Sequence, residues 1–138
     1  MSKGVLAGKR GLIMGVANDK SIAWGIAQSA AREGAELAFS YQGEVLEKRV
    51  APLAQQVGAD MLTCDVTDDA SIDALFKALE DKWGSLDFVV HAIGFSNKDE
   101  LKGEYLGTSR ENFALTMDIS VYSFTAVAQR AAPLMSEG

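Results

Sequence analysis

Four short apolar runs alternate with longer segments of helical periodicity, and this alternation limits the fold more than any other feature of the chain. The runs cover residues 12–14, 35–41, 60–64 and 86–92. Apolar residues recur at helical spacing in the segments 21–33, 45–57, 68–83 and 108–135. Strands that alternate with helices predict an α/β fold, in which right-handed crossovers build a parallel sheet with helices on both faces.

Local signals predict the faces and ends of the first three helices. Ile22, Ile26 and Ala30 are the apolar residues expected on one face of the first helix, and Gly34 follows as its stop. Pro52 predicts a kink or a restart in the second helix. In the third, Asp68 or Thr67 is the expected N-terminal cap.

The last helical segment is predicted as one long helix, from about residue 108 to about Met135. Residues 108–111 have the spacing of a capping box at its start. One side of it is apolar, and this stripe fits either packing on the sheet or packing between subunits. Its members are Phe113, Met117, Val121, Phe124 and Ala128.

The first strand leads into Gly15, and a polar loop then reaches Ser21 at the start of a helix. This order presents backbone N–H groups to a phosphate, and predicts a Rossmann-type doubly wound sheet. Ligands of such sheets bind at the carboxyl ends of the strands, which here are Gly15 and residues 41–42, 65–66 and 92–94. Alone, Gly15 equally fits a tight turn and Ser21 an ordinary N-cap, since the loop matches neither GxGxxG nor a Walker A motif.

Composition excludes several classes of protein. With 138 residues, 48% of them hydrophobic and 23% charged, the chain is typical of one soluble globular domain. A net charge of −6 disfavours partners such as nucleic acid or an anionic membrane. The single cysteine, Cys64, rules out an internal disulfide framework and a cysteine-rich metal site, and no metal site is predicted. Neither a signal peptide nor a membrane-spanning run is seen, so a cytoplasmic protein is expected.

Five segments together resemble the bacterial NADH-dependent enoyl-acyl carrier protein reductases, a divergent branch of the short-chain dehydrogenase/reductases. They occur in the same order and at matching intervals along essentially the whole chain. The segments are Gly15-x5-Ser21-Ile22-Ala23-Trp24-Gly25, Phe39-Ser40-Tyr41-Gln42, Cys64-Asp65-Val66, His91-Ala92-Ile93-Gly94-Phe95 and Asp118-Ile119-Ser120.

The resemblance implies a binding site for NADH. Near the pyrophosphate it implies Gly15, Ser21 and Ile22, with Gly25 allowing close packing of helix on strand. It places Gln42 at the adenosine end, Asp65 on the adenine amino group and Val66 against the ring. Ile93 and Gly94 would lie by the nicotinamide ribose, with Ile119 also facing the cofactor and Ser96 beside the acyl substrate.

Several of these assignments have a plainer alternative. Asp65 fits a loop aspartate that caps the following turn, Ser96 a loop serine, and Ile119 a residue of helix packing. His91, the only histidine, fits a hydrogen-bonded core residue better than a catalytic base. Since no Arg or Lys directly follows Gln42, NADH is favoured over NADPH.

By resemblance, the reaction is hydride transfer from NADH to the β-carbon of a trans-2-enoyl thioester carried on acyl carrier protein, a step of fatty acid biosynthesis. The resemblance implies a catalytic tyrosine and lysine with the spacing Tyr-x6-Lys, which would follow a fifth strand that is not predicted within residues 1–138. We therefore expect residues 1–138 to form an incomplete NAD-binding domain without catalytic residues, and assign structural roles to Tyr105 and Tyr122. The resemblance also implies a homotetramer.

Two other functions remain open from the sequence. A short-chain dehydrogenase/reductase acting on a carbonyl would share the sheet, but normally carries TGxxxGxG and Asn-Ala-Gly motifs that this chain lacks. The other is a nucleotide-binding fragment without catalysis. A flavodoxin-like signalling domain ranks third, because no acidic pocket is predicted after the first strand.

Overall fold

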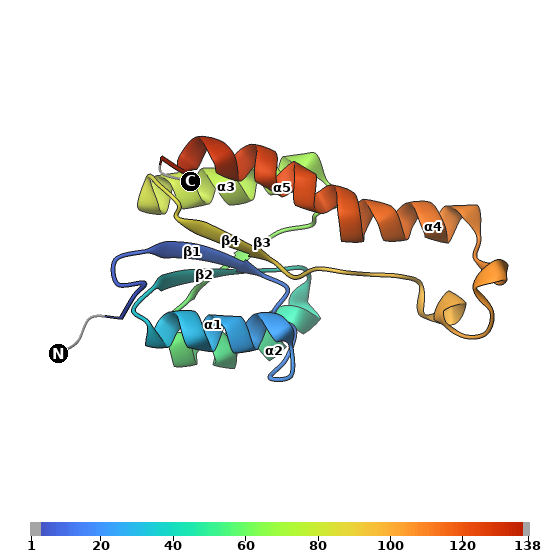
Figure 1. Ribbon diagram of the computed structural model, residues 1–138, viewed down its shortest axis with the longest axis horizontal. Helices are drawn as coiled ribbons and strands as arrows, with labels where there is room; N and C mark the ends of the chain where they lie inside the picture. The colour runs from blue at the N-terminus through green and yellow to red at the C-terminus, as the bar shows by residue number, and fades with distance from the viewer. Residues whose placement is uncertain (1–3, 137–138) are drawn as a thin grey trace.

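The computed structural model describes residues 4–136, which form a parallel sheet with helices on both faces (Figure 1). The strands are β1 (Arg10–Met14), β2 (Glu36–Tyr41), β3 (Asp60–Thr63) and β4 (Phe88–His91). The helices are α1 (Ile22–Arg32), α2 (Glu44–Val57), α3 (Asp69–Trp83), α4 (Arg110–Met117) and α5 (Ser123–Ala131). Shorter turns are η1 (Lys98–Leu101), η2 (Tyr105–Gly107), the π-helical η3 (Asp118–Tyr122) and η4 (Ala132–Leu134).

The four strands lie in the order β3-β2-β1-β4, and all neighbours are parallel. In the centre of the sheet Ile13 of β1 is level with Phe39 of β2 and with Val90 of β4. The chain first builds outward from β1 to β3 and then crosses back to place β4 on the other side of β1. This reversal is the switch point of a doubly wound sheet, so the predicted α/β fold is confirmed.

Alternate residues of the central strands feed two separate hydrophobic cores. Leu12 and Met14 of β1 point to the face covered by α3 and α5, whereas Ile13 points to the face covered by α1 and α2. Figure 1 shows these helix pairs on opposite sides of the sheet. Strands buried on both faces read as continuous apolar runs, which explains the sequence of residues 12–14.

Helix α1 buries a different face from the expected one. Ala23, Trp24, Ala27 and Ala30 pack on the sheet, whereas Ile22 is 80% exposed and Ile26 39% exposed. The small alanines let the helix lie close to the strands, and Trp24 meets Phe39 edge to face. The spacing of Ile22 and Ile26 therefore gave the wrong face. Gly25 does not serve close packing either, because a Cβ there would meet open space.

The second and third helices follow the sequence signals more closely, except for the restart considered at Pro52. Helix α2 runs without a restart through Pro52 to Val57. Asp68 caps α3 by accepting a hydrogen bond from the Ala70 amide at 3.0 Å. Gly58 and Gly84 end α2 and α3 in the left-handed conformation, as expected of helix stops.

The segment predicted as one long helix is interrupted. After α4, the π-helical turn η3 intervenes before α5, and η4 closes the segment. The N-cap of α4 is Ser109, whose hydroxyl accepts a hydrogen bond from the Asn112 amide at 3.0 Å. The capping box expected over residues 108–111 would have placed the cap one residue earlier. In Figure 1, α4 extends beyond the sheet, and the turns η1 and η2 lie near its far end.

The apolar stripe of this segment is largely exposed, although Phe124 meets His91 of β4 edge to face. Phe113, Met117, Val121 and Phe124 are between 42% and 59% exposed, while the buried residues of α5 are Ser123, Ala126, Val127 and Ala131. Packing on the sheet, one of the two expected roles for the stripe, is therefore met only at Phe124 among these four residues. Among the helices of residues 4–136, none has both the length and the apolar character needed to cross a membrane.

Candidate functional site

A cavity of about 470 Å³ lies at the carboxyl ends of the strands, where the switch point predicts a ligand. It extends across β1 from the end of β2 and β3 on one side to the end of β4 and η3 on the other. The lining residues are Gly15, Val16, Ala17, Ser40, Tyr41, Gln42, Leu46, Cys64, Val66, Thr67, Ala92, Ile93, Gly94, Phe95, Leu115 and Ile119.

Gly15 forms the floor of this cavity in a conformation that requires glycine. Its φ is +111°, and a Cβ at this position would overlap the carbonyl oxygen of Ala92. The adjacent ladder bond, from the Ala92 amide to the Met14 carbonyl, is 3.0 Å long. The ends of β1 and β4 can therefore approach closely only because residue 15 has no side chain.

Ser21 shapes the loop that leads from Gly15 to α1. Its hydroxyl oxygen accepts hydrogen bonds from the amides of Ala17 and Asn18, at 3.0 and 3.1 Å. The side chain therefore closes the loop and makes no cap bond to α1. The first-turn N–H groups of α1 have no side-chain cap as a result, which is the arrangement that binds anions at helix N-termini.

Asp65 orders the turn after β3. Its Oδ1 accepts from the amide and the hydroxyl of Thr67, at 2.9 and 2.6 Å, and its own amide donates to the Ser71 hydroxyl. In the structure, Asp65 therefore caps the following turn, as its alternative role predicted. With the turn fixed in this way, Val66 and Thr67 line the cavity.

His91 connects the end of β4 to the π-helical turn. Its Nε2 lies 2.7 Å from the Ser123 hydroxyl, and that hydroxyl donates to the carbonyl of Ile119. Because the serine proton is used in this way, Nε2 carries the imidazole proton and donates. Phe124 meets the ring edge to face. His91 is thus a hydrogen-bonded residue of the helix–sheet interface, as expected.

Burial away from water lowers the pKa of His91 below its ordinary 6.5, because it disfavours the charged ring. A backbone hydrogen bond opposes this shift but is the smaller effect. In the neutral ring, Nε2 carries the proton that is donated to Ser123, and Nδ1 carries no proton.

The structure brings together six of the ten predicted site residues on this cavity: Gly15, Gln42, Val66, Ile93, Gly94 and Ile119. Four others lie elsewhere. Ser21 and Asp65 support the loops behind the cavity wall, and Ile22 points into a different groove. Ser96 turns toward α4, where its hydroxyl accepts from Asn112 and Thr116, both at 3.0 Å.

Leu46, Cys64 and Leu115 line the cavity without having been assigned to it from the sequence. Desolvation raises the pKa of the buried Cys64 thiol to about 11, against a smaller opposing effect of its hydrogen bond to Ser71. Cys64 is therefore a protonated wall residue rather than a nucleophile. The sequence signal that could have assigned Cys64 to the cavity was its position directly before Asp65.

One pair of residues has the Tyr-x6-Lys spacing, Tyr41 and Lys48. Tyr41 ends β2 and lines the cavity, and Lys48 is exposed on α2. Tyr41 is the last residue of the second strand and Lys48 lies in the helix after it, whereas the resemblance implies a catalytic pair after a fifth strand. The spacing alone therefore assigns no catalytic role to Tyr41 or Lys48.

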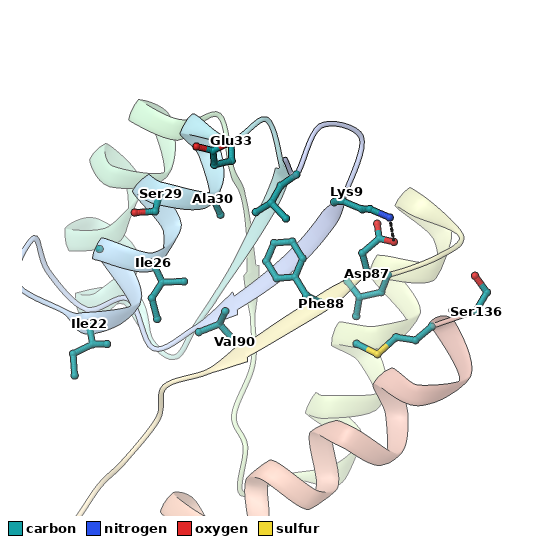
Figure 2. Close-up of a pocket in the computed structure, with 14 residues that line it drawn as sticks. Lys9, Ile22, Ile26, Ser29, Ala30, Glu33, Asp87, Phe88, Val90 and Ser136 are labelled. Carbon is teal, nitrogen blue, oxygen red and sulfur yellow. Dashed lines mark ion pairs between the residues drawn. The ribbon is translucent and has the colours of Figure 1, made fainter. Parts of the chain in front are cut away.

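A larger hollow, of about 810 Å³, lies beside the outer edge of β4 (Figure 2). Ile22 and Ile26 of α1 face Phe88 and Val90 of β4 across it, and the Lys9–Asp87 ion pair stands at one end. Within residues 4–136, β4 pairs with β1 alone. Since this groove follows the strand edge rather than the strand ends, it is not where a doubly wound sheet binds its ligand.

The fold, the glycine floor and the helix start beside it define a dinucleotide-binding class of α/β domain. The family described as enoyl-(acyl carrier protein) reductase matches residues 15–138. The chain belongs to this family.

Relatives with the same description are similar over nearly the whole chain. Enoyl-[acyl-carrier-protein] reductase [NADH] 1 of Rhizobium meliloti is 66% identical over 138 residues, covering 99% of this chain and 51% of the relative. A crystal structure of the reductase from Anaplasma phagocytophilum in complex with NAD has 53% identity and a TM-score of 0.94, over 99% of this chain and 53% of that one. The Bacillus cereus reductase with NADP+ and indole naphthyridinone has 46% identity and a TM-score of 0.94, over 98% and 54%. The chain thus spans about half the length of the relatives it matches.

The role of Gly15 predicts opposite effects for two glycine substitutions. Gly15→Ala places a Cβ against the Ala92 carbonyl at a positive φ, and should lower the free energy of unfolding by about 2 kcal/mol or more. Gly25→Ala, the matched control, adds a Cβ in open space within α1 and should raise it by up to about 1 kcal/mol. Urea unfolding followed by circular dichroism measures both, and equal effects would contradict the assigned geometry.

The environment of His91 predicts a loss of stability on acidification. Because its pKa is lower in the folded chain, the unfolded chain binds the proton more readily. The free energy of unfolding should therefore fall as the pH drops below about 6.5, and level off once the folded ring is protonated. An NMR titration of the single imidazole gives the pKa, and urea unfolding at pH 7.5 and 5.5 gives the stability.

The control for this prediction is His91→Gln, which lacks the titrating ring. The difference in stability between the two pH values should be smaller in the variant than in the unaltered chain. An imidazole that titrates above 6.5 would contradict the prediction.

Proposed function

We propose that the chain is the dinucleotide-binding part of an NADH-dependent enoyl-[acyl-carrier-protein] reductase. The observation that supports this most is the shared cavity of Gly15, Gln42, Val66, Ile93, Gly94 and Ile119. These residues come from five separate segments of the chain, each singled out beforehand by the resemblance. Residues 1–138 then form one NAD-binding domain, which lacks the catalytic portion of the enzyme.

The geometry supports a division of the cavity between the two halves of the cofactor. Gln42 and Val66 lie on the side of β2 and β3, where they would hold the adenosine half. Gly15 and the start of α1 lie in the middle, beside the pyrophosphate. Gly94 and Ile119 lie on the side of β4, beside the nicotinamide half.

The proposed reaction is hydride transfer to the β-carbon of a trans-2-enoyl thioester. NADH supplies the hydride when it is bound. The residues of this chain bind and orient that cofactor. The first turn of α1, which has no side-chain cap, offers backbone N–H donors to the pyrophosphate. Val66, Ile93 and Ile119 make apolar contact that excludes water. No catalytic acid is assigned to residues 4–136.

The charge at the adenosine end favours NADH over NADPH. Gln42 and Gly43 follow β2, and Glu44 begins α2 as an acidic residue of its first turn. A carboxylate there opposes a 2′-phosphate, and no basic residue directly follows the strand to receive one. The Bacillus cereus relative was solved with NADP+. For this chain we expect NADH to bind more tightly than NADPH.

The proposal also covers partners and location. The enoyl group would be carried by acyl carrier protein, an acidic partner by resemblance, and the exposed Lys98, Lys102 and Arg110 around η1 and the start of α4 are suited to its charge. The exposed apolar stripe on α4, η3 and α5 supports the implied homotetramer. A cytoplasmic location agrees with the single buried cysteine.

The first test is binding of NADH to the 138-residue chain, followed by the fluorescence of the cofactor. We expect saturable binding at micromolar concentrations, with NADPH several-fold weaker. Gly94→Leu should abolish it, because the new side chain would occupy the nicotinamide side of the cavity. Gly107→Leu is the matched control, since position 107 is exposed and has open space around it. Equal binding by both variants would contradict the proposed site.

The second test is turnover. The 138-residue chain, mixed with NADH and a crotonyl thioester, should oxidise no NADH above background. The reason is that none of its residues is assigned the role of the catalytic tyrosine or lysine that the resemblance implies. The decrease in absorbance of NADH measures this directly. Robust turnover would show that residues 1–138 do contain a catalytic group, and Tyr41 and Lys48 would be the first pair to replace.

A further inference from the structure

Ser120 makes two hydrogen bonds to one residue of the loop after β4. Its hydroxyl accepts from the Phe95 amide at 2.9 Å and donates to the Phe95 carbonyl at 3.1 Å. A single side chain thus pairs with both backbone groups of Phe95, as a neighbouring strand would do in a sheet.

This bridge begins where the sheet ends. The last ladder bond of β4 joins the Ala92 amide to Met14, and the chain then leaves β1. Gly94 and Phe95 are exposed, and Ser120 is the partner of the Phe95 amide and carbonyl within residues 4–136. Gly94 and Phe95 also line the cavity, so the bridge fixes part of its wall.

The π-helical turn η3 directs two neighbouring residues to the site at once. Ile119 lines the cavity while Ser120 holds Phe95. The carbonyl of Ile119 is in turn the acceptor for Ser123, which His91 contacts. Turns of this kind inside α-helices are frequent at functional sites. Both ends of the 91–95 segment are therefore tied to the same turn.

We propose that Ser120 is a positioning residue for the nicotinamide half of the cofactor. It holds Gly94 and Phe95 on one side of the cavity and, through η3, sets the depth at which Ile119 enters from the other. This inference rests on the proposed NADH site, and it predicts an effect confined to the half of the ligand that lies beside β4. The adenosine half, on the side of Gln42 and Val66, does not touch this wall.

The test compares two ligands, NADH and ADP, on the 138-residue chain. Ser120→Ala removes both bonds to Phe95 and should weaken NADH binding by roughly three- to tenfold. ADP carries only the adenosine end and the pyrophosphate, so its dissociation constant should change by less than about twofold. Fluorescence titration gives the constant for NADH, and NMR chemical shifts give the constant for ADP.

Two further variants separate positioning from general damage. Ser120→Thr keeps the hydroxyl and should restore NADH binding to near that of the unaltered chain. Thr125→Ala deletes an exposed hydroxyl from α5, in the same helical segment, and should change neither constant. Hydrogen exchange of the Phe95 amide should accelerate in Ser120→Ala but not in Thr125→Ala.

The outcomes distinguish this inference from the proposed function. NADH binding that is unchanged in Ser120→Ala overturns the positioning role and leaves the cofactor site standing. An equal loss for NADH and ADP also overturns it, because the effect would then be a general weakening of the fold. Absence of NADH or ADP binding by the unaltered chain overturns the proposed site, and the role of Ser120 with it.

Discussion

The close approach of β1 and β4 at Gly15 is the contact on which the site depends. The Ala92 amide reaches the Met14 carbonyl, and the Ala92 carbonyl occupies the space of a Cβ at position 15. Because the two strand ends meet there, the loop to α1 and the loop after β4 diverge from one point and leave a cavity between them. A side chain at position 15 would separate the strands and close off the floor of that cavity.

Most of the architecture could be predicted from the sequence because the central strands β1 and β2 are buried on both faces. Runs such as residues 12–14 have no polar face, and only an interior parallel strand accommodates them. Helix ends at Asp68, Gly58 and Gly84 were also predictable, since each depends on the local chemistry of one residue. The order of strands and helices was also sufficient to predict which strand ends form the cavity.

The failures share a physical cause: periodicity reveals an apolar face but not what covers it. Ile22 and Ile26 have helical spacing, yet the alanines beside them pack on the sheet and the isoleucines line a groove. The π-helical turn was missed because the bonds that accompany it are tertiary. Ser120 contacts Phe95 and Ser123 contacts His91, partners 25 and 32 positions away in the sequence. No pattern within one helix encodes those distances.

Volume alone does not select the cavity proposed here for the cofactor. The groove beside β4 measures about 810 Å³ and the cavity at the strand ends about 470 Å³. A dinucleotide carries a pyrophosphate, and an anion needs N–H donors more than space. The groove follows α1 and the outer edge of β4, whereas the smaller cavity lies at the glycine turn. Ser21, directly before α1, accepts a hydrogen bond from Ala17 of the cavity lining. The chain's net charge of −6 strengthens this point, because the phosphates of the proposed cofactor would be held by local backbone dipoles against an unfavourable overall field.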